Sequence, residues 1–465
     1  MRLLNTILKF FFSTKLTGVL LIIFALAMAI ATFIENDYGT ETSKALIYGA
    51  KWFEIIIVLL GVNFMGNIAK YNLVSWEKAP VLLLHLAFII IIIGAGITKY
   101  RGFEALVTIK ENENTNRILS IDSFLQLQAD DEKFTKNYSP TPVIMSQLGF
   151  NHINENYTFQ DKKINVTLNK FIPRAAYVLK DAKNGDDFLH LVIADDAQRK
   201  DFYLKKGTRK NFYGLTIAFE TPYELLNEIY IKTTDSAVVA RFPETTNYFS
   251  MLENKAGSYK KNTFTPLKFK ALSEINKVPI VFNSVENNKT LQLIQKEIDP
   301  KVKNPESAIK IQVTSGTESK ELTLFGGKGY MNPNTTLYIN NMHLKLRYGS
   351  RPIHLPFSVR LKNFTLERYP GSDSPSAFYS DLQLTSPSDT LDYQIFMNNV
   401  LDYKGYRFFQ SAYLPDESGT ILSVNHDYWG TFVTYIGYAL LALGMFCSLL
   451  WNTQLFAFIP KTNMV

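Results

Sequence analysis

Four apolar runs, each close to the length that crosses a lipid bilayer, constrain this chain more than any other feature of its sequence. They cover residues 16–34, 52–68, 81–98 and 428–450, and a membrane-spanning helix needs about twenty apolar residues. Between the third and fourth runs the chain is polar. The pattern predicts a membrane protein with four transmembrane α-helices, three N-terminal and one C-terminal, and a large domain on one side of the bilayer.

Lysine and arginine near the ends of these runs predict the orientation, because cytoplasmic segments are enriched in them. One side of the predicted spans carries Arg2, Lys9, Lys15, Lys70 and Lys78, and the other carries Lys44, Lys51, Lys99 and Arg101. From this small bias we expect both termini and the loop between the second and third spans in the cytoplasm. Residues 35–51 and 99–427 then lie on the periplasmic side of a bacterial inner membrane.

The ends of the spans fit this layout. Amphipathic aromatic side chains favour the headgroup level, and the span ends carry Trp52, Tyr428, Trp429 and Trp451. Residues 27–29 (Ala-Met-Ala) resemble a signal-peptide cleavage site, but two more spans follow directly, which favours an uncleaved anchor. The predicted regions are residues 1–99, residues 100–427, and residues 428–465 with the last span and a short cytoplasmic tail.

The predicted outer domain, residues 100–427, has apolar residues at alternate positions, which is typical of half-buried strands. Examples are residues 105–110, 164–168, 309–313, 343–347 and 357–361, and turn signals occur at residues 184–185, 326–327 and 370–371. Residues 222–229 are the best candidate for a short helix, and a break between two lobes is expected near residues 250–300, where lysine and asparagine are frequent. We expect a large β-rich extracytoplasmic domain of two antiparallel layers or sandwich-like lobes.

Composition excludes several functions. The net charge of +7 is spread along the chain without a polybasic block or zinc-ligand spacing, which argues against nucleic acid as a partner. Cys447 is the single cysteine and lies in an apolar run. The chain therefore carries no redox-active cysteine pair and no motif for covalent heme attachment, and no nucleophile elbow or metal triad indicates a hydrolase.

His85 is the residue that most strongly suggests a function. It lies in the third span among apolar neighbours, about 6 Å from the cytoplasmic end of the run. An ionisable side chain in a membrane helix costs a few kcal/mol unless it has a partner, which makes it a functional candidate. Neutral imidazole is a good axial ligand for heme iron. A hydrogen bond to a carbonyl of a neighbouring helix explains it equally well.

The other histidines carry weaker signals. His152 and His190 fit packing or surface roles, with His190 inside an apolar strand. His343 and His354 flank residues 347–351 (Arg-Tyr-Gly-Ser-Arg), a basic cluster able to hold a carboxylate or propionate, although a solvated strand–loop–strand is favoured. His426 precedes the last span. It either touches a ligand that emerges from the bilayer or caps the helix start beside Asp427.

Several stretches resemble the ResB (also called CcsB) family of cytochrome c biogenesis proteins, and the Bacteroidetes-type members most closely. Three spans, a large outer domain and a final span form its layout. Local matches are residues 31–39 at the end of the first span, residues 84–95 in the third span, residues 355–372 in the outer domain, and residues 403–411 (Tyr-Lys-Gly-Tyr-Arg-Phe-Phe-Gln-Ser) just before the last span. The resemblance is good at both ends of the chain and loose over residues 110–340.

The resemblance implies a role beside a CcsA-like membrane protein, transporting heme b across the lipid bilayer and presenting it to apocytochrome c. The third span of the family carries a heme-associated histidine, which is His85 here. The CcsA-like half that often follows on the same chain is not found, so we expect a separate partner to supply the second axial ligand. The chain is then no enzyme by itself but one subunit of a holocytochrome c synthase, and alone it binds heme weakly or not at all.

Three rival interpretations remain. The chief one is a scaffold or chaperone subunit of the assembly complex that never touches heme. A membrane-anchored sensor would want a cytoplasmic signalling module, and the last fifteen residues resemble none. A b-type electron-transfer subunit would want paired histidines on two spans, whereas only His85 lies in a span.

Overall fold

The computed structural model describes residues 9–195, 198–276, 278–297 and 305–450, and it divides into two compact units. The first combines Met1–Phe171 with Ala308–Val465, and the second is Ile172–Ser307. Each is described by itself. The second boundary, at residue 307, lies close to the 250–300 stretch where we expected a break, whereas no break was predicted at residue 172.

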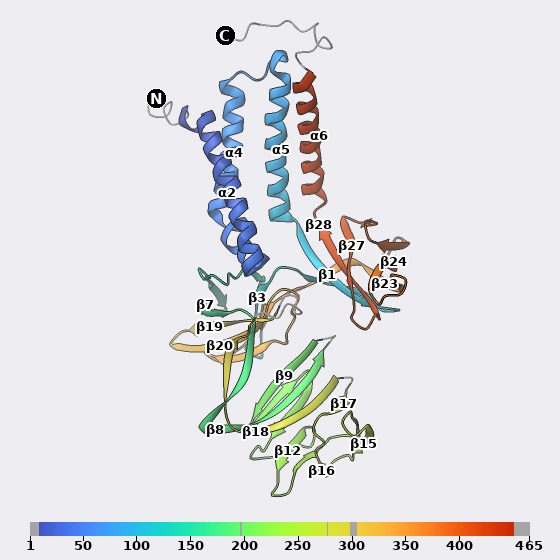
Figure 1. Ribbon diagram of the computed structural model, residues 1–465. Coiled ribbons are helices and arrows are strands. Elements are labelled where there is room, and N and C mark those ends of the chain that lie inside the picture. The colour runs from blue at the N-terminus through green and yellow to red at the C-terminus, as the bar shows by residue number, and fades with distance from the viewer. Residues whose placement is uncertain (1–8, 196–197, 277, 298–304, 451–465) are drawn as a thin grey trace. The chain divides into compact units, whose positions relative to one another are not determined.

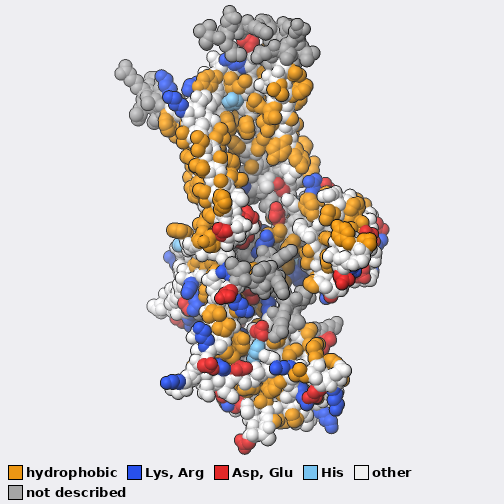
Figure 2. Space-filling model, viewed as in Figure 1, with side chains coloured by type: hydrophobic (Ala, Val, Ile, Leu, Met, Phe, Trp, Pro, Cys, Tyr) orange, Lys and Arg blue, Asp and Glu red, His pale blue; other side chains and the backbone are white. Residues whose placement is uncertain are grey.

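Four long helices of the first unit match the predicted spans: α2 (Thr14–Tyr38), α4 (Lys51–Lys70), α5 (Ala79–Arg101) and α6 (Tyr428–Leu450) (Figure 1). All four are long and apolar enough to cross a membrane. Orange hydrophobic side chains cover the helical part (Figure 2). Three short elements connect the helices: α3 (Thr40–Ser43), the π-helical turn η1 (Lys44–Tyr48) and the 3₁₀ turn η2 (Trp76–Lys78). Arg2 and Trp451, which supported the predicted orientation and span ends, lie outside the described residues.

Glycines allow α5 and α6 to pack at close range. Gly430, Gly437 and Gly444 recur every seven residues and are the buried positions of α6. A Cβ atom on Gly437 would lie 2.6 Å from Ile91 Cγ1 and 3.2 Å from the carbonyl oxygen of Ala87, both on α5. Small residues let membrane helices approach until their backbones touch, which gains van der Waals contact without a hydrophobic driving force. The two helices therefore run side by side (Figure 1).

Polar side chains connect α2 to α4. Asn63, on α4, is 1% exposed and accepts a hydrogen bond from Thr17 of α2 at 2.6 Å. Its Nδ2 donates to the carbonyl oxygen of Phe11 at 2.6 Å, and Asn67 donates to its Oδ1 at 2.9 Å. An amide in hydrocarbon needs such partners. The α2–α4 contact therefore uses hydrogen bonds where the α5–α6 contact uses glycine.

Three sheets form the β-rich part of the first unit. The eight-stranded sheet has the order β25–β24–β23–β2–β1–β28–β27–β26, with the bounds β25 (Thr390–Phe396), β24 (Pro375–Thr385), β23 (Pro352–Arg368), β2 (Asn114–Ser120), β1 (Phe103–Lys110), β28 (Gly419–His426), β27 (Tyr406–Tyr413) and β26 (Leu401–Tyr403). The second sheet has β21 (Thr335–Ile339), β22 (Met342–Gly349), β3 (Phe124–Asp130) and β4 (Thr135–Asn137), with β5 (Thr141–Pro142) also on β3. The third has β20 (Glu318–Gly326), β19 (Ser307–Ser315), β7 (Lys162–Ile172) and β6 (Asn154–Phe159).

The alternating residues of these strands build two cores. One core lies between the second and third sheets and includes Leu125, Leu344, Ile164 and Ile311, each 0% exposed. The other lies within the eight-stranded sheet and includes Val107, Val359 and Phe408. All five strand segments expected from the period-two pattern are strands here, and a turn occupies residues 370–371 as expected. The turn expected at residues 326–327 lies slightly later, at residues 328–329, because Gly326 still belongs to β20. The β-rich domain between the helices is confirmed.

The second unit is a sandwich of two sheets around one core. Its six-stranded sheet has the order β15 (Lys255–Tyr259), β14 (Thr246–Ser250), β17 (Ala271–Ile275), β18 (Val278–Gln295), β8 (Ala175–Asp195) and β9 (Gln198–Lys205). Its five-stranded sheet has β10 (Thr208–Phe212), β11 (Leu215–Phe219), β12 (Ile229–Thr233), β13 (Val238–Arg241) and β16 (Phe264–Pro266). Only β11 and β12 pair in parallel among the paired strands described for this unit.

Two local predictions in the second unit were wrong. Asn184–Gly185 is no turn, since both residues lie inside β8, where the pairing with β18 shifts register between Glu286 and Lys289. A Cβ on Gly185 would lie only 2.4–2.7 Å from backbone atoms of Asn288 and Lys289, which is too close for any side chain, so glycine is needed for this bulge. Residues 222–228 form bends and a turn, with no helix, and Ile229 begins β12. The carboxylate of Glu228, 1% exposed, accepts from the backbone N–H of Leu225 and pairs with Arg209, which stabilises this loop.

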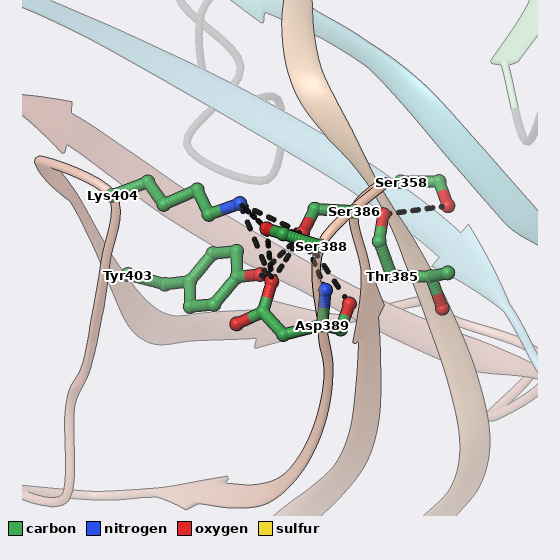
Figure 3. A network of polar contacts seen from close by, with 7 residues as sticks. All are labelled: Ser358, Thr385, Ser386, Ser388, Asp389, Tyr403 and Lys404. Carbon is green, nitrogen blue, oxygen red and sulfur yellow. Dashed lines mark hydrogen bonds and ion pairs between the residues drawn. The ribbon is translucent and has the colours of Figure 1, made fainter.

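A polar network joins opposite edges of the eight-stranded sheet (Figure 3). Tyr403, on β26, donates to Asp389 Oδ1 at 2.8 Å, just before β25, and Lys404 Nζ lies 3.3 Å from the same oxygen. Ser386 also donates to this carboxylate. Hydrogen bonds from Ser386, then from Tyr403, lower the pKa of Asp389 to about 2.

Replacing Asp389 with asparagine should lower the thermal stability of the purified chain in a pH-dependent way. The native pKa lies below that of an unfolded aspartate, about 3.9, so the stabilisation is fully present above that value and is lost as pH falls toward 2. The melting temperatures of the two proteins should differ at pH 7 and converge near pH 2. Asp373→Asn, in an exposed turn of the same sheet, is the control. A gap that stays constant across this range would contradict the assignment.

Candidate functional site

His85 lies on α5, six residues after the helix begins at Ala79 and sixteen before it ends at Arg101. At 1.5 Å per residue these separations are about 9 Å and about 24 Å. The helix begins two residues before the apolar run, at Ala79. His85 therefore lies farther from the start of its helix than the 6 Å expected from the sequence. Arg101 leads directly into β1, whereas Ala79 follows the loop between α4 and α5. His85 is therefore near the end of the helical part that lies away from the β-rich part.

One hydrogen bond sets the state of the His85 ring. Nδ1 lies 2.8 Å from the carbonyl oxygen of Val81, one turn earlier on α5. A carbonyl only accepts, so Nδ1 carries the proton and donates it. No described residue forms a hydrogen bond with Nε2, which in the neutral ring presents a lone pair. This is the arrangement of a metal-ligating histidine, in which a carbonyl on one nitrogen fixes the tautomer and leaves the other free.

One aromatic ring packs against the imidazole. Phe64, on α4, meets His85 edge-on with ring centroids 5.7 Å apart, and it stacks on Phe88 of α5 at 5.3 Å. His85 is itself half-buried. The free nitrogen is thus held on a lipid-exposed apolar surface, which suits one edge of a porphyrin. The hydrogen bond to a neighbouring helix, which was the alternative explanation, is not observed among the described residues, since the partner Val81 is on the same helix.

The second predicted residue, His426, lies at the other end of α5. It ends β28, with its ring stacked on Phe103 at 5.0 Å and tilted against Tyr406 at 4.4 Å. It pairs with Phe103 across β1 and β28, directly after α5 ends. The structure therefore does not bring His85 and His426 together, because the length of a membrane span separates them.

His426 borders a shallow hollow of about 310 Å³ where the helices meet the sheet, lined by Ile97, Arg101, Gly405, His426, Asp427, Tyr428 and Trp429. The residue that directly precedes α6 is Asp427 and not His426. Asp427 accepts from Thr98 Oγ1 at 2.6 Å and its carbonyl accepts from the N–H of Thr431 at 3.1 Å. His426 therefore lies beside the hollow at the start of α6 and does not cap that helix.

The remaining histidines have ordinary surroundings. His190 Nε2 lies 2.8 Å from Asp201 Oδ1, and its Nδ1 lies 2.9 Å from Asn283 Nδ2. His343 packs against Tyr338 with ring centroids 4.9 Å apart. His152 and His354 are exposed. No group of three or more His, Cys, Asp or Glu side chains is placed to hold a metal ion in the described part of the chain.

Sequence reasoning missed the asparagines of α4. Asn63 and Asn67 lie in the second span, on α4, whereas His85 lies on α5. Asn67 Oδ1 is buried without a hydrogen-bond partner among the described residues. The signal was available, because amides inside an apolar run are as costly as an imidazole. Their contacts lead toward α2, so they organise the helices and do not face His85.

The comparisons with known proteins now bear on this geometry. Residues 322–422 match the family described as ResB-like. The chain carries a ResB-like region. This region runs from within β20 to within β28, and it contains the predicted family stretches at residues 355–372 and 403–411. The predicted resemblance to the ResB family is confirmed.

A curated relative resembles almost the whole chain. Protein NrfI of Wolinella succinogenes is 29% identical over 440 residues, which is 94% of this chain and 34% of NrfI. The chain thus spans about a third of the length of this relative. The likeness reaches beyond the ResB-like region into most of the helices and the second unit.

Proposed function

We propose that this chain acts in cytochrome c biogenesis, where it binds heme through His85 during its passage across the membrane. The observation that carries the proposal is the state of the His85 ring: Nδ1 donates to Val81, and Nε2 has no hydrogen-bond partner among the residues that the structure describes. The ResB-like region and the extended likeness to NrfI support the biological setting. Heme is the cargo in this proposal, and the protein supplies one nitrogen ligand in an apolar setting.

A CcsA-like membrane protein is the proposed partner. His85 is the one histidine in the four spans, and its half-buried ring offers a single ligand. A second axial ligand then comes from a helix of the partner that packs near Phe64 and Phe88. This accounts for an imidazole that the fold leaves at its lipid-exposed surface.

The position of His85 along α5 suggests the direction of transport. We place the bacterial inner membrane so that the strands between α5 and α6 are periplasmic and the loop between α4 and α5 is cytoplasmic. His85 then lies about 9 Å from the cytoplasmic end of its helix, where heme enters. The strands between α5 and α6 then lie on the side where apocytochrome c receives heme. A scaffold that never touches heme is the rival, favoured by the large share of the chain that lies in strands between α5 and α6.

A maturation assay tests the proposed process. In a host that lacks its own maturation system, co-expression of the full chain, a CcsA-like protein and an apocytochrome c should give covalently bound heme, which a peroxidase stain detects after denaturing electrophoresis. Omission of the chain should remove the stained band, with apocytochrome measured by immunoblot as the control. A band of equal strength without the chain would contradict a role in biogenesis.

A further inference from the structure

Three arginines gather where the chain crosses between two sheets of the first unit. Arg117 is on β2 of the eight-stranded sheet, Arg347 is on β22 of the second sheet, and Arg351 lies between β22 and β23. Hydrogen bonds hold the crossing together. Ser350 Oγ donates to the carbonyl oxygen of Ser120 at 2.7 Å, and the N–H of Arg351 donates to Ser120 Oγ at 2.9 Å.

The register places Arg347 and Arg351 over one face of β3. Arg347 pairs with Gln126 across the strands, and its Nη2 donates to Gln126 Oε1 at 2.6 Å. The guanidinium of Arg351 lies over the ring of Phe124, 4.6 Å from its centroid. Residues 124 and 126 project to the same face of a strand, and the opposite face, with Leu125 and Leu127, enters the core. The two cations are therefore neighbours.

Arg347 and Arg351 are half-buried and Arg117 is exposed, and two of these cations leave a buried nitrogen without a partner in the described part of the chain. The Nε atoms of Arg347 and Arg351 are both buried without a hydrogen-bond partner among the described residues. Burial, and then the charge of Arg117, lowers the pKa of Arg347. No carboxylate in the described ranges forms an ion pair with any of the three. A buried donor left unsatisfied costs free energy, and a like charge adds to that cost.

Four other arginines of the described residues are paired with carboxylates. Carboxylates accompany them in the pairs Arg209–Glu228, Arg241–Glu224, Arg368–Glu417 and Arg407–Asp402. The planar guanidinium matches two oxygens of a carboxylate or phosphate and is the side chain of choice for such anions. The three arginines, which form no ion pair with a carboxylate of the described residues, thus offer donors that suit an oxyanion.

We propose that Arg117, Arg347 and Arg351 form a binding site for a carboxylate or phosphate group of an amphipathic molecule. Asp122, beside the crossing, pairs with Lys44 in the segment that joins α2 to α4. The crossing therefore lies next to the ends of two predicted membrane spans, and this position favours a ligand from the membrane. Porphyrin propionates and anionic phospholipid headgroups both offer this chemistry. The porphyrin source rests on the proposed function, whereas the lipid source does not.

The test compares the purified full chain with Arg347→Met, both carrying His85→Ala so that iron ligation plays no part. Metal-free mesoporphyrin and its dimethyl ester, which lacks the carboxylates, are titrated by fluorescence. Phosphatidylglycerol and phosphatidylcholine vesicles are compared by flotation. Arg407→Met, which removes an arginine that Asp402 already holds at 2.6 Å and 2.8 Å, is the control of equal charge.

The protein that retains Arg347 should bind one anionic probe at least about tenfold more tightly than the neutral counterpart of that probe. The Arg347→Met protein should lack this preference. Preference for mesoporphyrin identifies a propionate, and preference for phosphatidylglycerol identifies a lipid phosphate. Without ligand, Arg347→Met should melt at the same temperature or higher, because a half-buried cation whose buried Nε has no partner among the described residues is gone. Equal affinities in both proteins, or a lower melting temperature with the anion preference intact, would overturn the proposal in favour of a structural arginine.

Discussion

A valine in place of Gly437 should lower the free energy of unfolding by roughly 3 kcal/mol, because α5 and α6 leave no space for a side chain there. The new Cβ would lie 2.6 Å from Ile91 Cγ1, 3.1 Å from the backbone nitrogen of Ile91 and 3.2 Å from the carbonyl oxygen of Ala87. Two of these atoms are backbone and cannot rotate away. The helices must separate, which removes the contact along their whole length.

The effect should reach the β-rich part. The strand β1 continues α5, the strand β28 leads into α6, and the two strands pair from Phe103↔His426 to Lys110↔Gly419. Helix separation therefore pulls on a strand pair. Thermal unfolding in detergent, followed by size-exclusion chromatography of heated samples, measures the loss. Gly96→Val is the matched control on α5, where a Cβ meets nothing within 4 Å. Equal stability of the two variants would contradict this packing.

Replacing His85 with alanine should reduce the yield of covalently matured cytochrome c at least about tenfold in the maturation assay. The change removes the one imidazole in the spans, whereas the protein should accumulate normally. The ring is half-buried, and its single hydrogen bond is to Val81 on its own helix, so little stability depends on it. Loss of heme delivery without loss of protein would separate ligation from a scaffold role.

Two controls accompany this prediction. His152→Ala removes an exposed histidine of the β-rich part and should leave the yield unchanged. Phe64→Leu keeps an apolar side chain but removes the ring that meets His85 edge-on at 5.7 Å. It should reduce the yield less than His85→Ala does. Full maturation in His85→Ala at equal protein level would support the scaffold and reject ligation.

The parts of the fold that local patterns encode were predictable. Apolar runs gave the four spans because the bilayer demands an unbroken run of fixed length. Alternation gave strands such as β1 and β22 because one face of each enters a core. His85 stood out for the same reason, since its cost in hydrocarbon is a property of the residue and its immediate neighbours.

Pairings between distant segments were beyond the sequence. Residues 184–185 have the strongest local turn signal, but β18, about a hundred residues later, extends β8 through them as a bulge. Asn63 and Asn67 acquire meaning only when α2 supplies their partners. The basic cluster at residues 347–351 was visible locally, whereas Arg117 joins it from another strand. Tertiary contacts decided each of these.

The most direct measurement of the central claim is the absorption spectrum of the complex purified with a CcsA-like partner. The account predicts a Soret band of six-coordinate heme in the wild-type complex and a weakened band in His85→Ala, with both subunits still co-purifying. A spectrum unchanged by His85→Ala would contradict ligation by His85 and remove it from the site.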